Sequence, residues 1–242
     1  MRLLVINANT SSGVTDLCSI AARKVAAATT EILPMTGRFG ARIIESRAEN
    51  AIAAHALLDL LAEHRGTADA ALIAVSYDTG LAEARDIVGF PVIGITQASL
   101  SIAMLIGSRI GMITFGTPWI YRELAESYGA GRRLAGIEVV QASAKDAYGN
   151  PDVVRAAVGH AIRKLIDHAG ADVVVLCGAA FAGMATDVGK DVAIPVLDGV
   201  TCGVPLCETL VALKVRSNPP GGGKGGAIAL SAALDNALYG KP

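Results

Sequence analysis

The sequence predicts an α/β protein made of two similar four-stranded parallel-sheet lobes that face each other across a cleft. Three observations carry this prediction. Short runs rich in Val, Ile and Leu alternate with Ala-rich segments of helical spacing along the 242 residues. Hydrophobic residues make up 52% of the chain but aromatic residues only 4%, which suits buried parallel strands flanked by closely packed helices. The spacing of the apolar runs also nearly repeats halfway along the chain.

Eight apolar runs are expected to form strands buried on both faces, because each is short and ends in polar or glycine-rich turns. These strands are expected at residues 3–6, 31–35, 71–75, 92–95, 110–114, 136–140, 173–177 and 195–197. Pro91 directly precedes the fourth run, a position where proline is compatible with the start of a strand.

Ala-rich segments between these runs carry apolar residues at helical spacing. Helices are expected at residues 14–28, 48–64, 97–106, 119–128, 151–169 and 202–213. Asn150 followed by Pro151 fits an N-cap and the first helical position. A final helix is expected at residues 227–238. The glycine-rich segment 221–226 before it is interpreted as a flexible connection, because no strand precedes it as a dinucleotide-binding loop requires.

The strand spacing predicts how the chain divides into lobes. Strand starts at residues 3, 31, 71 and 92 are matched by starts at residues 110, 136, 172 and 195. The first lobe is expected to span residues 1–97 plus 211–242, and the second residues 98–210. Open parallel sheets bind ligands beyond the carboxyl ends of their strands, so a site is expected in the cleft between the lobes.

Composition excludes several classes of partner. The chain has 21 basic and 22 acidic residues, a balance that argues against nucleic acid or an anionic membrane surface as partner. No apolar run approaches the roughly 20 residues of a membrane span, and the apolar start is too short for a signal peptide. The four cysteines show no paired spacing for zinc or disulfides, so no metal is expected. We therefore expect a cytoplasmic protein that acts on a small molecule.

Polar turns follow the expected strands, and the first supplies two candidate ligand-binding residues. Residues 7–13 read Asn-Ala-Asn-Thr-Ser-Ser-Gly and lead into a helix. Asn9 and Thr10 could offer amide and hydroxyl groups to a carboxylate or ring carbonyl near the helix N-terminus. The alternative is an ordinary helix-capping turn.

The turns after the third and fifth strands add further candidates. Polar residues follow the third strand directly, and one closes the fifth: Ser76, Tyr77, Asp78, Thr79, Gly80 and Thr114. Asp78 could instead cap the helix that is expected to begin at Leu81.

Cys177 is the cysteine expected at a strand end, whereas the other three fall within expected helices. A thiol that faces a helix N-terminus can have a lowered pKa and exchange protons. Gly178 and Ala179 follow it and could present backbone N–H groups to a ligand. The alternative is that Cys177 packs as a small apolar residue.

Four segments together resemble the aspartate/glutamate/hydantoin racemase superfamily, in its hydantoin racemase-like branch, which also includes allantoin racemase. They are residues 5–11, the Asp-Thr-Gly-Leu turn at 78–81, Ala-Gly-Met at 182–184 and Pro-Val-Leu-Asp-Gly-Val at 195–200. The resemblance runs to about residue 215. It implies two facing α/β lobes, a site in their cleft, no metal or organic cofactor, and a homo-oligomer.

The resemblance further implies two-base proton transfer at a carbon next to a carbonyl, with two cysteines on opposite faces of that carbon. Here the sequence departs from the family pattern. Gapless counting places Val75 at the first cysteine and Phe181 at the second, with Cys177 four residues upstream. Valine and phenylalanine cannot transfer a proton, so neither family cysteine carries over.

The leading hypothesis is a cofactor-independent racemase or isomerase of a small hydantoin-like or amino-acid-like substrate. Cys177 is the expected proton-transfer group, and its opposite partner would be Ser76, Tyr77 or Asp78. Asp78 has the most suitable acidity if burial raises its pKa toward neutrality. Substrate binding is expected from Asn9, Thr10, Tyr77, Thr79, Gly80, Thr114, Gly178 and Ala179. The alternatives are a single-base malonate-type decarboxylase and a non-catalytic small-molecule binding protein.

Overall fold

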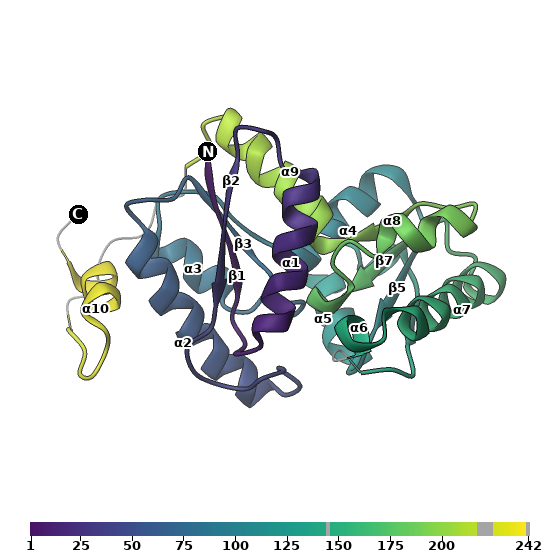
Figure 1. Cartoon of the computed structure of the whole chain (residues 1–242), viewed down its shortest axis with the longest axis horizontal. Coiled ribbons are helices and arrows are strands. Elements are labelled where there is room, and N and C mark those ends of the chain that lie inside the picture. Colours follow the sequence, from purple (N-terminus) through teal and green to yellow (C-terminus); the bar gives the residue numbers. More distant parts are fainter. Residues whose placement is uncertain (144–145, 217–224, 241–242) are drawn as a thin grey trace.

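Two four-stranded sheets, each entirely parallel, form the framework of the computed structural model, which describes residues 1–143, 146–216 and 225–240. The first sheet has the order β2-β1-β3-β4 and the second the order β6-β5-β7-β8. The predicted fold class is therefore confirmed. The lobes lie side by side in Figure 1, with α10 at the outer end of the first and α7 toward the outer end of the second.

Strand positions match the apolar runs of the sequence closely. The first sheet contains β1 (Arg2–Asn7), β2 (Glu31–Thr36), β3 (Ala70–Ile73) and β4 (Val92–Gly94). The second contains β5 (Ile110–Thr114), β6 (Leu134–Val139), β7 (Val173–Cys177) and β8 (Val196–Asp198). Every residue of β3, β5 and β7 is buried, as expected for strands covered by helices on both faces.

Helices cover both sheets. The longer ones are α1 (Ser12–Val25), α2 (Arg47–His64), α4 (Ile95–Ile106), α5 (Pro118–Ser127), α7 (Pro151–Ala169) and α9 (Gly199–Ala212). Shorter ones are α3 (Leu81–Ile87), α6 (Asp146–Gly149), α8 (Ala185–Val188) and α10 (Ala232–Tyr239), with 3-10 turns η1 (Gly131–Arg133), η2 (Ala179–Phe181) and η3 (Gly189–Asp191). Within the described ranges, no helix is long and apolar enough to cross a membrane.

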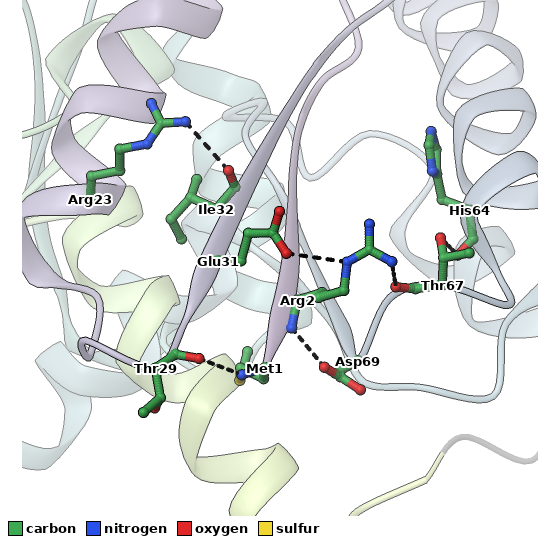
Figure 2. Close-up of polar contacts among 9 residues, drawn as sticks. All are labelled: Met1, Arg2, Arg23, Thr29, Glu31, Ile32, His64, Thr67 and Asp69. Atoms are coloured by element: carbon green, nitrogen blue, oxygen red, sulfur yellow. Dashed lines mark hydrogen bonds and ion pairs between the residues drawn. The ribbon is translucent and has the colours of Figure 1, made fainter.

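Polar contacts tie the first strand to its neighbours at the end of the sheet where the parallel strands begin (Figure 2). The backbone N–H of Arg2 donates to Asp69 Oδ2 at 2.6 Å, and its guanidinium donates to the carbonyl of Thr67 at 2.7 Å. The same guanidinium lies 3.3 Å from Glu31 Oε2 on β2. Because β1, β2 and β3 run parallel, their carboxyl ends all lie at the opposite end of the sheet from these contacts.

The helices that follow the edge strands begin earlier than the sequence pattern predicts, α4 at Ile95 and α9 at Gly199. Asp198 is the N-cap of α9 and accepts a hydrogen bond from the backbone N–H of Thr201, which satisfies a free donor of the first turn. The corresponding residue before α4 is Gly94, which has no side chain to supply this bond. A carboxylate from another turn supplies it instead.

Both of these helices join the two lobes. Helix α4 contacts β4 in the first sheet and β7 and β8 in the second, and α9 contacts β3 and β4 as well as β8. The predicted division into residues 1–97 plus 211–242 and residues 98–210 stays a prediction, since these helices pack on both sheets.

The C-terminal helix begins later than predicted, at Ala232 instead of residue 227. Ser231 is its N-cap and accepts a hydrogen bond from the backbone N–H of Leu234, which fixes the first turn. The helix packs against α2, where Leu234 joins the core of the first lobe. Most of the glycine-rich segment predicted as a flexible connection, residues 221–224, lies outside the described residues.

Candidate functional site

A cavity of about 330 Å³ lies at the carboxyl ends of the strands, between the two lobes. Most of its wall comes from the segments that follow β1, β2, β3, β5, β6 and β7, with one residue each from α1 and α5. The lining residues are Asn9, Val14, Ile43, Ile44, Glu45, Ala74, Val75, Ser76, Tyr77, Thr114, Phe115, Gly116, Thr117, Tyr121, Ser143, Cys177, Gly178, Ala179 and Ala180. This is the position in which facing α/β sheets are expected to bind a small molecule.

Many of the residues singled out in the sequence meet in this cavity. Those that line it are Asn9, Ser76, Tyr77, Thr114, Cys177, Gly178 and Ala179. Those that do not are Thr10, Asp78, Thr79 and Gly80. Their assigned roles in binding and catalysis stay predictions, and the hydrogen bonds described below indicate what each can do.

Two asparagines in the turn after β1 have different hydrogen-bonding roles. Asn7 is fully buried, and its amide nitrogen donates to Asn9 Oδ1, the carbonyl of Ser11 and Thr15 Oγ1. Asn9 Oδ1 also accepts from the backbone N–H of Ser11. These bonds fix the amide orientation of Asn9, because its oxygen is engaged inside the turn. Among the described residues its amide nitrogen has no hydrogen-bond partner, and Asn9 lines the cavity, so this donor remains available to a ligand.

Thr10 makes its hydrogen bonds to the segment that follows β2. Its backbone N–H donates to the carbonyl of Ala41 at 3.0 Å, and its hydroxyl donates to the same carbonyl at 3.3 Å. Thr10 therefore holds the segment between β2 and α2, which brings Ile43, Ile44 and Glu45 to the cavity wall.

The turn after β3 places two hydroxyl groups in the cavity. Ser76 Oγ accepts a hydrogen bond from the hydroxyl of Tyr121 on α5 at 2.8 Å. The hydroxyl of Tyr77 donates to Thr117 Oγ1 at 3.4 Å. The carbonyl of Ser76 accepts from Thr96 Oγ1 at 2.6 Å, which fixes the turn against α4. Each hydroxyl pair therefore joins a residue of the first lobe to one of the second.

Asp78 lies beneath this turn and supplies the missing cap of α4. Its carboxylate accepts from the backbone N–H groups of Thr96 and Gln97, at 3.0 and 2.7 Å, and from the hydroxyl of Tyr128 at 2.8 Å. A side chain at Gly94 would collide with it, since an added Cβ would lie 2.2 Å from Asp78 Cγ. Burial raises the pKa of Asp78 to about 7, and the three hydrogen bonds of its carboxylate all come from groups of the protein.

The two residues after Asp78 also support the turn from below. Thr79 is fully buried and donates its hydroxyl to Asn50 Oδ1 at 2.5 Å. Gly80 is the N-cap of α3 and has a φ of 64°, a left-handed conformation that glycine adopts without strain. Neither contributes a group to the cavity in this structure.

Cys177 and Thr114 reach the cavity from the second lobe. They are register partners at the ends of β7 and β5, and both are buried. Burial raises the pKa of the Cys177 thiol well above its ordinary value, and the charge of Asp78 raises it further. The resting thiol is therefore protonated at neutral pH.

The two positions that correspond by counting to the family cysteines have different surroundings. Val75 lines the cavity next to Ser76. Phe181 is fully buried and stacks on Phe115, with ring centroids 4.0 Å apart. The turn after β7, which contains η2, leaves Phe181 behind the cavity wall and Cys177 in it.

Tyr121 was not among the predicted site residues, because the prediction considered strand ends and this residue lies in the first turn of a helix. A tyrosine one turn into a helix that directly follows a polar strand-end turn is the signal that could have found it.

The cavity wall has little charge. Glu45 is its one charged lining residue among the described residues, and the rest are amide, hydroxyl, thiol and apolar groups. In the described ranges, no three His, Cys, Asp or Glu side chains are grouped as a metal ion would require.

Known proteins resemble this chain over nearly its full length. The hydantoin racemase of Pseudomonas sp. (strain NS671) is 28% identical over 222 residues, covering 90% of this chain and 89% of its own. The structure of allantoin racemase from Klebsiella pneumoniae matches with a TM-score of 0.91 and 30% identity, covering 99% of both chains. That of allantoin racemase from Pseudomonas fluorescens matches with a TM-score of 0.86 and 28% identity, covering 90% of this chain and 94% of its own.

The family model described as Asp/Glu/Hydantoin racemase matches residues 3–207, which include every strand of both sheets except the first residue of β1. The predicted family is confirmed: the chain belongs to the Asp/Glu/hydantoin racemase family.

Proposed function

We propose that the protein is a cofactor-independent racemase, which inverts a carbon next to a carbonyl in a small hydantoin-like or amino-acid-like substrate. One observation carries this proposal beyond the family. Strands β3 and β7 hold the same place in the order of their sheets. Ser76 follows β3, Cys177 ends β7, and both residues line one cavity. Proton transfer groups therefore reach the cavity from facing lobes, as inversion of a carbon requires.

The contacts suggest a division of labour between these groups. Cys177 as thiolate removes the substrate proton, so a C–H bond breaks and an S–H bond forms. Ser76 delivers its proton to the opposite face and takes one from Tyr121, whose hydroxyl already donates to Ser76 Oγ. Burial raises the pKa of Tyr121 above its ordinary value, so it holds this proton until the transfer. The free amide N–H of Asn9 is placed to bind the carbonyl on which charge develops.

Substrate selection follows from the character of the wall. Among the described lining residues there is no Lys, Arg or His to neutralise a carboxylate. Neutral donors suit a hydantoin ring, whose carbonyl groups carry no full charge, better than a free amino acid.

The four described cysteines are free and buried, which supports the predicted cytoplasmic location. Assembly as a homo-oligomer stays a prediction.

Turnover in D2O tests the proposed reaction. The full chain is incubated with enantiopure 5-substituted hydantoins, allantoin and aryl malonates, while optical rotation, deuterium at the reacting carbon and CO2 are followed. Loss of rotation together with uptake of deuterium is the expected result. CO2 release from malonates would instead indicate the decarboxylase, and ligand-dependent melting without turnover the binding protein. Neither alternative is favoured, because the relatives described above are racemases.

Replacing Asn9 is expected to weaken substrate binding by about 1–3 kcal/mol, because a buried carbonyl loses its donor. The informative variant is Asn9→Asp, which keeps the oxygen that accepts from Asn7 and Ser11 but removes the amide N–H. Affinity is measured by calorimetry with a substrate on which the enzyme turns over slowly. Unchanged affinity in a folded Asn9→Asp variant would show that this residue only shapes the turn.

A further inference from the structure

Helix α5 is the part of the second lobe that closes against the first lobe around the cavity. Ser76 and Tyr77 bond to Tyr121 and Thr117 of this segment, and Asp78 bonds to Tyr128 at its C-cap. These contacts lie on the inner side of α5, which carries the hydroxyl of Tyr121 into the cavity. The position of Tyr121 and of the Ser76 hydroxyl therefore depends on where α5 sits relative to the first lobe.

A separate contact crosses between the lobes on the outer side of α5. Arg47, the first residue of α2, donates from Nη2 to both carboxylate oxygens of Glu123, at 2.8 and 2.9 Å. Its guanidinium carbon lies 4.5 Å from the ring centroid of Trp119, a cation–π distance. Glu123 and Trp119 both belong to α5. Arg47 follows closely on Ile43, Ile44 and Glu45, which line the cavity, so the ion pair lies near the cavity wall.

The backbone is strained at the beginning of α5. Thr117, its N-cap, has a φ of 28°, which is unfavourable for a β-branched residue, and Gly116 precedes it. Strained residues of this kind persist where the surrounding structure fixes them, and they concentrate at elements that move. Here the hydrogen bond that Thr117 Oγ1 accepts from Tyr77 across the cleft helps to fix this conformation.

We propose that Arg47 is a positioning residue of the reaction: by binding Glu123 and Trp119 it holds α5 closed over the cavity and keeps Tyr121 bonded to Ser76. The kinetic part of this inference rests on the proposed function, whereas the closure itself does not. We call this contact of Arg47 with Glu123 and Trp119 the latch. It can break and form again, since the side chains of Arg47 and Glu123 are 67% and 58% exposed. Exposed ion pairs and exposed cation–π contacts are individually weak, so α5 can open to admit substrate.

The chain offers a matched control for removal of Arg47. Arg38 lies in the same segment between β2 and α2 and binds Glu63 of α2, with Nη2 2.6 Å from Oε2. That ion pair is also exposed on the arginine side but stays within the first lobe. Arg38→Ala therefore removes the same charge and a comparable contact without touching α5.

Hydrogen exchange of the unliganded full chain tests the closure without any substrate. Arg47→Ala is expected to speed exchange in peptides from α5 about three- to tenfold, as loss of weak surface contacts allows, while Arg38→Ala exchanges as the wild type does. The melting temperatures of the two variants should agree. Equal exchange of α5 in all three proteins would overturn the proposal.

Kinetics with a racemised hydantoin supply the second measurement. Arg47→Ala and Arg47→Glu are expected to lower kcat/KM about three- to tenfold, whereas Arg38→Ala retains it. The double variant Arg47→Glu with Glu123→Arg restores the ion pair and should recover most of this loss. Failure of the double variant to recover would also overturn the latch. If no substrate is racemised but α5 exchanges faster in Arg47→Ala, the proposed function fails and the latch stands.

Discussion

Replacing Cys177 with serine is expected to lower kcat/KM for racemisation about 10²- to 10⁴-fold, the range typical of losing a general acid–base group. A serine hydroxyl fits the same buried space at the end of β7 but does not ionise in the accessible pH range. Cys177 is the cysteine that lines the cavity, and the other three lie in α1 and α9. The variant should therefore fold normally and bind substrate while turning it over slowly.

The control for this experiment is Cys207→Ser. Cys207 is fully buried in α9, where its thiol contacts the carbonyl of Ala71 away from the cavity. We expect Cys207→Ser to keep its activity, even if it loses some stability. Full activity of the Cys177→Ser variant would exclude its thiol from the mechanism and leave it as a packing residue.

The pH dependence of wild-type turnover gives an independent check on Cys177. Burial holds the pKa of this thiol well above its ordinary value, so only a small fraction is thiolate at neutral pH. The rate should therefore rise about tenfold per pH unit until the thiol ionises. Alkylation by iodoacetamide should follow the same rise. A thiol that labels rapidly at pH 7 would contradict the raised pKa.

Replacing Asp78 with alanine is expected to lower the free energy of unfolding by about 3 kcal/mol or more, because buried donors lose their acceptor. The orphaned groups would be the backbone N–H of Thr96, that of Gln97, and the hydroxyl of Tyr128. Urea unfolding measures the loss. Asp78→Asn keeps an acceptor of the same shape and should lose less. An Asp78→Ala variant as stable as the wild type would show that α4 needs no such cap.

The sign of the pH effect at Asp78 follows from its raised pKa of about 7, against about 3.9 in an unfolded chain. The folded protein holds this proton more tightly, so the contribution to stability is fully present below pH 4. It is lost as the pH rises to 7, at about 1.4 kcal/mol per unit of pKa difference at most. Relative to Asp78→Asn, the wild type should lose stability across this window. A constant difference between the two proteins would contradict the shift.

Position at the end of an expected strand predicts most of the residues that line the cavity and were singled out in the sequence. Asn9, Ser76, Tyr77, Thr114 and Cys177 each follow or end a buried strand, and parallel strands of one sheet end at one edge. That geometry is local and repeats, so sequence pattern alone brought these residues together. The same rule failed to separate Asp78 from its neighbours, because it predicts which turn a residue occupies but not whether its side chain points into the cavity or beneath it.

The sequence by itself determined the two lobes, their parallel strands and the family, since apolar runs buried on both faces and the strand-end motifs are local features. Only the tertiary structure decided which polar groups face the cavity. Asp78 caps α4 because Gly94, distant in sequence, has no side chain there, and Tyr121 reaches Ser76 because α5 crosses from the other lobe. Both relations join residues 16 to 45 positions apart through packing between elements, which no local periodicity encodes.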